Sequence, residues 1–355
     1  MIRLAKPWIG EDEQRAVAAV LESGRLVQGP LVERFEHAVA ALVGRKYAVA
    51  VSSGTVALDL ALKAVGVQEG DEVLCPAMSW PSPGHAIVGR GAQIRWADID
   101  ALEWNSSPGS LGATRTAETR AAIVIDQFGN PVRADGVTRA LAGLPIVEDA
   151  ACALGSRFHH APCATLGLVS TLSFHPRKII TTGEGGMCLT DDTSIAERLR
   201  ALRNHGLRDG VFVEPASNAR MTEFAAALGL SQLKRLDEIV ARRRQLARRY
   251  QEGLAGRVDT QQAPDGAESN YQTFGIVLPD RFDRETTRRA MHDRDIETGL
   301  LSYAMHTLES LPAAHKPLPV TERIVAQGMA LPLYPQMRNS DADLVIRALC
   351  EILDG

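Results

Sequence analysis

The sequence predicts an α/β protein with a mainly parallel central sheet, followed by a smaller α+β domain. Short apolar runs typical of buried strands alternate with helical patterns along the first part of the chain. Beyond about residue 237 this alternation stops. Alternating strands and helices favour parallel pairing, with helices on the faces of the sheet. The chain has 355 residues, 45% of them hydrophobic, and is long enough for about two domains.

The elements of the predicted sheet domain follow one another in order. Residues 11–21 have helical periodicity that ends near Gly24, residues 47–51 form an apolar strand, and residues 56–65 continue as an Ala- and Leu-rich helix. Further buried strands are predicted at 71–76, 93–96, 121–125 and 144–147, the last continued by Glu148 and Asp149. Ligands gather at the carboxyl ends of parallel strands, so the residues after these strands are expected along one edge of the sheet. They are Ser53, Gly54, Thr55, Met78, Ser79, Trp80, Asp126, Gln127 and Asp149.

The last third of the chain has a different pattern. A long Arg-rich helix begins near Asp237 and is followed by a strand at 273–278 and helices at 284–293 and 340–353. We therefore predict a large domain over residues 1–236, with an N-terminal arm, and a small α+β domain over residues 237–355. The run 241–249 is basic, and we interpret it as the solvated face of a helix.

Composition disfavours several classes of function. A formal net charge of −4 gives no reason to expect nucleic acid as a partner. No segment approaches the ~18 apolar residues of a membrane span, and no secretory signal pattern is present, so no membrane partner is expected. Five cysteines without a Cys-x-x-Cys pair predict reduced thiols and a cytoplasmic location. His159, His160 and His205 lack the accompanying Cys or carboxylate spacing of a metal site, so no metal is expected.

A lysine between an apolar strand pattern and a Gly-rich turn is the first candidate for chemistry. Residues 171–174 read TLSF, Lys178 follows, and the turn GEGG occupies residues 183–186. Burial lowers the pKa of a lysine amine and so favours a Schiff base with a carbonyl compound. The glycine spacing fits neither a P-loop nor a dinucleotide-binding loop. Taken alone, this signal is weak, because most lysines near glycines are surface lysines.

Three other positions each allow two interpretations. Asp149 ends a buried strand, where its carboxylate either needs a cationic partner such as a pyridinium nitrogen or caps a helix. Residues 53–55 open a helix whose free N–H groups either bind a phosphate or form an ordinary cap. Trp80 follows a strand and either stacks on a flat ring or belongs to the core.

Together and in this order, these motifs resemble the DegT/DnrJ/StrS aminotransferases. The resemblance covers nearly the whole chain, and its middle motifs are specific in combination. The matching stretches are GRLVQGP (24–30), SSGTVAL (52–58), GDEV (70–73), VEDAA (147–151), SFHPRK (173–178), GEGGM (183–187), NARM (218–221) and LPLYP (331–335). The resemblance implies the type I aminotransferase fold, with pyridoxal 5′-phosphate (PLP) bound in the large domain.

The resemblance also implies roles for single residues. Lys178 would be the Schiff-base lysine and proton shuttle, Asp149 would hold the pyridinium nitrogen, and Trp80 would stack on the ring. The phosphate of the cofactor would be bound by Gly54, Thr55, Ser173 and, from the neighbouring subunit, Asn218. The active unit would therefore be a homodimer with shared sites, although Asn218 could instead cap a loop of its own subunit. Glu184 and His306 would lie on the substrate side.

Two stretches depart from the pattern of the family. Its members commonly have Gln or His three residues after the aspartate, in contact with the ring hydroxyl. This chain has Cys152 there, a much weaker hydrogen-bond partner. Before the late histidine the family often has His-Tyr and a proline, where this chain has Ser302, Tyr303, Ala304 and Met305. The first departure concerns the tuning of the cofactor, and the second concerns the choice of substrate.

The leading expectation is a PLP-dependent aminotransferase that moves an amino group from glutamate or glutamine to a keto sugar on a nucleoside diphosphate. One alternative is a PLP enzyme of the same family that acts on a cyclitol or an aromatic precursor. A second, of a different class, is a non-catalytic regulator with a vestigial ligand site. Such a site has no reason to retain Lys178 together with Asp149, and a sugar dehydratase of this family would have His at position 178.

Overall fold

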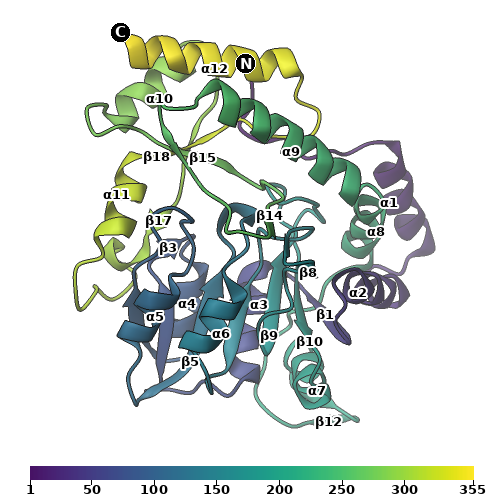
Figure 1. Ribbon diagram of the computed structural model, residues 1–355. Coiled ribbons are helices and arrows are strands. Elements are labelled where there is room, and N and C mark those ends of the chain that lie inside the picture. Colours follow the sequence, from purple (N-terminus) through teal and green to yellow (C-terminus); the bar gives the residue numbers. More distant parts are fainter.

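Seven strands form the central sheet of the protein, which a computed structural model describes over residues 1–355 (Figure 1). Their order is β1 (Tyr47–Val51), β10 (Gly186–Thr190), β9 (Val169–Ser173), β6 (Ile146–Asp149), β5 (Thr119–Ile125), β2 (Glu72–Pro76) and β4 (Gln93–Ala97). The strands from β9 to β4 pair in parallel, whereas β10 pairs antiparallel with both β9 and β1. The predicted mainly parallel α/β sheet is confirmed, and β1 lies at its antiparallel edge.

Helices cover both faces of this sheet because its strands alternate their side chains between two cores. In β1, Val49 and Val51 pack in one apolar cluster, and Ala48 and Ala50 pack in another on the opposite face. The first face is covered by α3 (Gly54–Ala64), α4 (Ser82–Gly89) and α7 (Thr193–Leu202). The other face is covered by α2 (Pro30–Val43), α8 (Glu223–Leu233), α5 (Pro108–Thr114) and α6 (Ala134–Ala140). Parallel sheets need this cover on both faces.

A second, antiparallel sheet lies toward the C-terminus. Its strands are β13 (Asp259–Thr260), β15 (Phe274–Val277), β18 (Gly328–Leu331) and β16 (Gly299–Leu300). It packs with α9 (Leu236–Gly253), α10 (Arg284–His292) and α12 (Asn339–Asp354). The strand and helices predicted after residue 237 are therefore present. The boundary at 237 stays a prediction, because α9 contributes Val240 to a core of the large sheet and Leu246 to that of the small one.

Shorter elements complete the chain. They are α1 (Glu11–Ser23), β3 (Met78–Ser79), η1 (Gln127–Gly129), β7 (Arg157–Phe158), β8 (Ala161–Pro162), β11 (Leu207–Arg208), β12 (Val211–Phe212), β14 (Ala267–Glu268), β17 (Tyr303–Ala304), η2 (Met305–Thr307) and α11 (Pro319–Gln327). None of the helices combines the length and the apolar character that a membrane crossing requires.

A short strand pair joins the two parts of the molecule. In β17, Tyr303 pairs with Ser79 of β3, and Ala304 pairs with Met78. The N–H of Met305 also donates to the carbonyl of Ala77, at 2.8 Å. Residues 303–305 therefore pair with the segment 77–79 that follows β2 of the large sheet.

The basic run 241–249 is not simply a solvated helix face, and that interpretation was wrong for one residue. Arg243 is 3% exposed, and its guanidinium donates to the carbonyl oxygens of Tyr271 and Gln272, at 3.1 and 3.0 Å. Burial lowers its pKa to about 10. Arg243 therefore fixes the segment that leads into β15.

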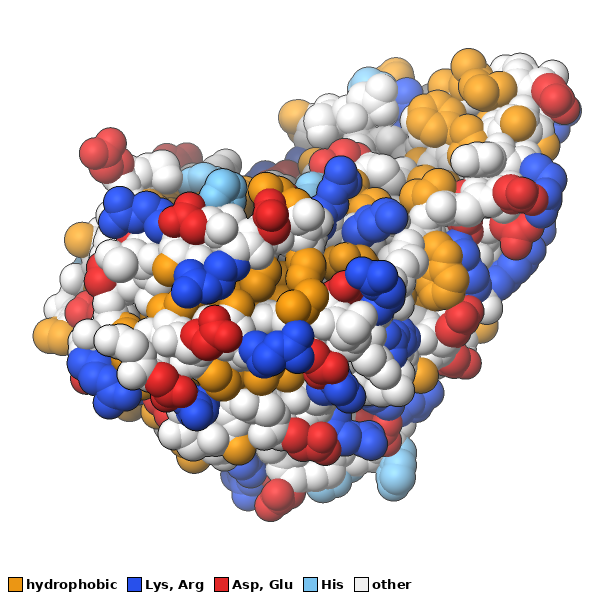
Figure 2. All heavy atoms as spheres, turned by 90° about the horizontal axis from the view of Figure 1, so that it is seen from above, with side chains coloured by type: hydrophobic (Ala, Val, Ile, Leu, Met, Phe, Trp, Pro, Cys, Tyr) orange, Lys and Arg blue, Asp and Glu red, His pale blue; other side chains and the backbone are white.

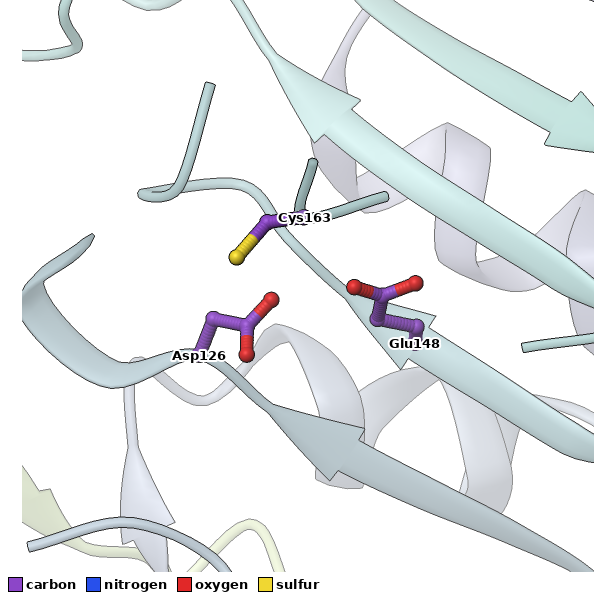
Figure 3. A group of neighbouring side chains, drawn as sticks. All are labelled: Asp126, Glu148 and Cys163. Carbon is purple, nitrogen blue, oxygen red and sulfur yellow. The ribbon is translucent and has the colours of Figure 1, made fainter. Parts of the chain in front are cut away.

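A buried group of titratable side chains lies behind the carboxyl ends of β5 and β6. Figure 3 shows Asp126, Glu148 and Cys163 pointing toward one another. Their carboxylate and thiol atoms all lie within 4.8 Å of one another. No spacing in the sequence predicts this group, because its members converge only in the folded chain. Asp126 was expected at the ligand edge, but it is not among the residues that line the cavity described below.

Hydrogen bonds hold the Glu148 side of this cluster in place. The Glu148 carboxylate accepts from four donors: the N–H groups of Ala164, Leu166 and Gly167 and the hydroxyl of Ser170. Asp126 Oδ1 accepts from the N–H of Val132 at 2.9 Å, and its buried Oδ2 has no partner. Burial and the negative charge of Glu148 raise the pKa of Asp126 well above its usual range. This environment therefore favours the protonated form of Asp126.

Asp126→Asn should stabilise the protein increasingly as pH rises. The folded protein binds the Asp126 proton more tightly than the unfolded chain does. Wild-type stability is therefore highest below the unfolded-state pKa and falls as the pH rises toward the folded-state pKa. The amide does not titrate and lacks this loss. Between pH 5 and 8 we expect the free energy of unfolding of the variant to gain on that of the wild type, by up to about 1.4 kcal/mol for each pH unit below the folded pKa.

Urea unfolding at several pH values measures this difference. Asp135→Asn, at a side chain that is 69% exposed, is the matched control and should show no such trend. A pH-independent difference for Asp126→Asn, or a stoichiometric metal ion that this substitution removes, would contradict a neutral Asp126.

Candidate active site

A cavity of about 950 Å³ opens at the carboxyl ends of the parallel strands, between the two parts of the molecule. The large sheet contributes residues that follow β1, β5, β6 and β9, as ligand sites in such sheets do. The small part contributes Arg288 of α10 and Leu300 of β16. Seven of the residues predicted to hold the cofactor lie in its wall: Gly54, Thr55, Trp80, Asp149, Cys152, Ser173 and Lys178.

Lys178 lies in a tight turn after β9. Its N–H donates to the carbonyl of His175 at 2.8 Å, and its Nζ lies 3.1 Å from Sγ of Cys152. Burial lowers the pKa of the amine, but Cys152 and the carboxylate of Asp149 raise it more, so the pKa lies above that of a free lysine. The lowered pKa expected from burial alone was wrong, because Cys152 and Asp149 could not be identified from the sequence as neighbours of Lys178.

Asp149 is the last residue of β6 and is 6% exposed. Burial raises its pKa, whereas Lys178 and the N–H of Ala151, which donates to Oδ1 at 3.1 Å, lower it. No helix begins directly after Asp149, so the alternative of a helix cap has no support. Its carboxylate faces the same cavity as the amine of Lys178.

The start of α3 forms a cradle for an anion. Ser53 caps the helix by accepting the N–H of Val56 at 3.2 Å, and the first N–H groups of a helix have no partners within it. A Cβ on Gly54 would lie 2.7 Å from Cβ of Ser173, so only glycine allows this close approach. The Thr55 hydroxyl lies 2.7 Å from that of Ser82. Backbone and hydroxyl donors therefore converge at a helix N-terminus, which suits a phosphate.

Trp80 follows β3 and is 64% exposed, so it is not a core residue. Its ring meets that of Tyr303 edge-on, with centroids 5.5 Å apart and planes at 79°. Trp80 also lines the cavity, which places an exposed aromatic ring where a flat ligand could stack on it.

Glu184, predicted for the substrate side, lines the cavity, whereas two other predicted residues do not. Asn218 is exposed, and its Oδ1 accepts only the N–H of Arg220, at 3.5 Å. His306 is 8% exposed, lies in η2, and has its Nε2 3.3 Å from the carboxylate of Glu322. The roles predicted for both residues stay predictions.

Gln127, expected at the ligand edge of the sheet, lines the cavity, but the sequence assigned it no role. Several other cavity residues were not predicted as site residues. They are His175, Arg177, Gln272, Arg288, Ser302 and Tyr303. His175 and Arg177 lie within the motif around Lys178, so their position in the sequence could have identified them. Burial lowers the pKa of His175, which the carboxylate of Glu184 raises in part. Gln272 and Arg288 belong to the other part of the molecule and carry no local sequence signal.

The residues present fit PLP. A buried carboxylate, a lysine amine, an aromatic face and a phosphate cradle with no room for a Cβ all border one cavity. These are the groups that such a cofactor needs for its ring nitrogen, aldehyde, ring face and phosphate.

Comparison with known proteins agrees with this geometry. The profile of the DegT/DnrJ/EryC1/StrS aminotransferase family matches residues 7–350. The spore coat polysaccharide biosynthesis protein SpsC of Bacillus subtilis (strain 168) is 33% identical over 376 residues, which cover 98% of this chain and 96% of SpsC.

Two solved structures are similar over their whole length. The aminotransferase TlmJ from Streptoalloteichus hindustanus superimposes with a TM-score of 0.94 at 32% identity, covering 100% of this chain and 99% of TlmJ. The sugar aminotransferase CalS13 from Micromonospora echinospora gives a TM-score of 0.92 at 30% identity, covering 100% of both chains. The chain therefore belongs to the DegT/DnrJ/EryC1/StrS family and is a PLP-dependent aminotransferase.

Proposed function

We propose that this enzyme transfers an amino group from glutamate or glutamine to a keto sugar carried on a nucleoside diphosphate. The main support is the cavity of about 950 Å³, which places Lys178 and Asp149 beside space for a second, larger ligand. Similarity to a sugar aminotransferase and to a polysaccharide biosynthesis protein supports a sugar as the acceptor. At the mouth, the guanidinium of Arg177 makes no ion pair or hydrogen bond within the chain, which suits an anionic substrate group.

In this proposal each residue of the cavity has a separate role toward the cofactor or the substrate. Bound PLP supplies an electron sink for the reacting carbon. Asp149 would keep the ring nitrogen protonated, and the N–H groups of Gly54 and Thr55 would hold the phosphate. Lys178 would carry the cofactor and, once released by the substrate, would move a proton at the substrate carbon through Nζ. Its pKa would fall on loading, because a cation paired with Asp149 weakens the pull of that carboxylate on the ammonium.

The same proposal includes a homodimer with shared sites. Asn218 is exposed and lies outside the cavity of its own subunit, so it is free to reach a neighbour. Apolar residues on either side of it in sequence are also exposed, Phe212 at 70% and Phe224 at 40%. Figure 2 shows apolar side chains grouped on the part that projects at the upper right, whereas acidic and basic side chains mingle over the broad face nearest the viewer. A second copy would cover apolar surface of this kind.

A reducing compartment suits the chain. All five cysteines are free, and burial raises the pKa of Cys75, Cys163 and Cys188, so that these thiols stay inert. We therefore place the enzyme in the cytoplasm. A non-catalytic regulator has no supporting observation, since Lys178 and Asp149 are both retained in one cavity.

The cofactor should be attached to Lys178. The purified enzyme should absorb in the visible range, borohydride should abolish this band, and peptide mapping should find the pyridoxyl group on Lys178. Lys178→Ala should lose the band, whereas Lys46→Ala, at an exposed lysine, should keep it. A reduced adduct on any other lysine would refute this assignment.

The acceptor should be a nucleotide-linked keto sugar. The enzyme is first converted to its aminated form with glutamate, and the return of the visible band is followed after adding nucleotide-linked keto sugars, the corresponding free sugars and keto-cyclitols. We expect the nucleotide-linked compounds to react at least about ten-fold faster in kcat/KM, which corresponds to about 1.4 kcal/mol of binding to the nucleotide. Equal or faster reaction with a cyclitol would favour the alternative acceptor.

Two inactive variants should restore activity if the sites are shared. Lys178→Ala and Asn218→Asp are mixed under conditions of subunit exchange. The mixed dimer then has one site with both defects and one with neither, so activity should return to as much as about half per mixed dimer. The matched control mixes Lys178→Ala with Asp149→Asn, whose residues line one cavity of one subunit and should not complement. Continued inactivity of the first mixture, with mixed dimers present and Asn218→Asp inactive alone, would show that Asn218 serves its own subunit.

A further inference from the structure

One end of the cavity is lined by two uncharged polar side chains from different parts of the molecule. Gln127 lies in η1, directly after β5, and is 5% exposed. Ser302 lies between β16 and β17 and is 9% exposed. Both belong to the wall of the cavity. The chemistry described above uses neither of them.

The hydrogen bonds of Gln127 fix the direction of its amide. Nε2 donates to the carbonyl oxygen of Met78 at 2.9 Å and to Oγ of Ser302 at 3.4 Å. A carbonyl oxygen only accepts, so the NH₂ group must be the side of the amide that faces Met78. The other side, Oε1, accepts from no protein group and is not sealed inside the core. Gln127 therefore offers an oriented acceptor to the cavity.

Ser302 supplies a hydrogen-bond donor beside the acceptor of Gln127. Its Oγ accepts from Gln127, and its own O–H donates to no protein group. A serine hydroxyl that accepts one hydrogen bond still has a donor to give. The pair thus offers one acceptor and one donor side by side, with no charge on either residue.

Apolar residues lie close to the pair in sequence. Ile125, Phe128 and Leu301 also line the cavity. The backbone around the pair is held firmly, since the N–H of Gln127 donates to Oδ1 of Asn105 at 2.8 Å and its carbonyl accepts from Gln261 at 3.1 Å. A few fixed polar groups in an apolar wall are typical of sites that orient a small ligand.

We propose that Gln127 and Ser302 form a hydroxyl-recognition pair that selects the sugar. A hydroxyl group both donates and accepts, so one substrate hydroxyl satisfies Gln127 Oε1 and the Ser302 O–H together. A carboxylate accepts only and an ammonium donates only, so neither matches the pair. The pair therefore identifies a hydroxylated ring as the ligand of this end, and it distinguishes such a ring from its deoxy form. This inference rests on the proposed function.

The test compares a nucleotide-linked keto sugar that reacts with the wild type against its single-deoxy analogues. The wild type should prefer the hydroxylated compound over one deoxy analogue by about 10- to 100-fold in kcat/KM. Gln127→Leu and Ser302→Ala should each reduce this preference to about three-fold or less, mainly by slowing the hydroxylated compound. Gln272→Leu, at a cavity glutamine whose Nε2 donates to the carbonyl of Arg177, is the control and should leave the ratio unchanged.

Two further measurements separate the possible failures. The visible band of the cofactor and the melting temperature report whether each variant is folded and loaded, and Ser302→Ala, which keeps the Gln127–Met78 bond, serves if Gln127→Leu does not fold. A wild type that reacts but discriminates against no deoxy analogue, or variants that keep the full preference or slow both compounds equally, would overturn the recognition pair alone. A wild type that reacts with no keto sugar would overturn the proposed function and the pair with it.

Discussion

A carboxylate buried at the end of a parallel strand must have a positive partner, and the centre of this protein is arranged around that constraint. Asp149 is 6% exposed and receives one backbone hydrogen bond, from Ala151, so its charge is compensated mainly by the ammonium of Lys178. The neighbouring carboxylate, Glu148, points to the other side of β6 and is satisfied by four donors. Consecutive residues of one strand thus carry a structural and a chemical carboxylate, and the alternation of side chains along the strand keeps them apart.

The position of Glu148 on the far side of β6 places it beside a second buried carboxyl group, that of Asp126. A carboxylate oxygen of each lies within 4.8 Å of the other and of the Cys163 thiol. Two charges of the same sign in a dry environment are far less stable than one charge and one neutral acid. Burial and the charge of Glu148 therefore raise the pKa of Asp126 well above its usual range. Burial also raises the pKa of Asp149, but there the ammonium of Lys178 opposes the rise, so the two aspartates at strand ends differ in the charge of their neighbours.

Most of the fold could be predicted from local patterns of apolar and polar residues. The strands at 47–51, 93–96 and 121–125 were recognisable because apolar runs of this length between helical patterns have few other solutions. The cavity residues next to Lys178 were also recognisable, since they share one motif. What the sequence did not reveal depends on contacts between distant residues. The raised pKa of Lys178 depends on Cys152 and Asp149, the burial of Arg243 depends on the carbonyl of Tyr271, and the pairing of Gln127 with Ser302 joins residues 175 positions apart.

The segment that carries Ser302 is anchored at both ends. β16 ends at Leu300 in the small sheet, β17 begins at Tyr303 beside β3 of the large part, and only two residues lie between them. Surface loops usually tolerate insertions and deletions. This segment does not, since one added or deleted residue would break one of the two strand pairings or turn its side chains to the opposite face. New substrate preferences at this wall of the cavity therefore arise by exchange of side chains at fixed length, and the enzyme is a suitable scaffold for redesign by point substitution there.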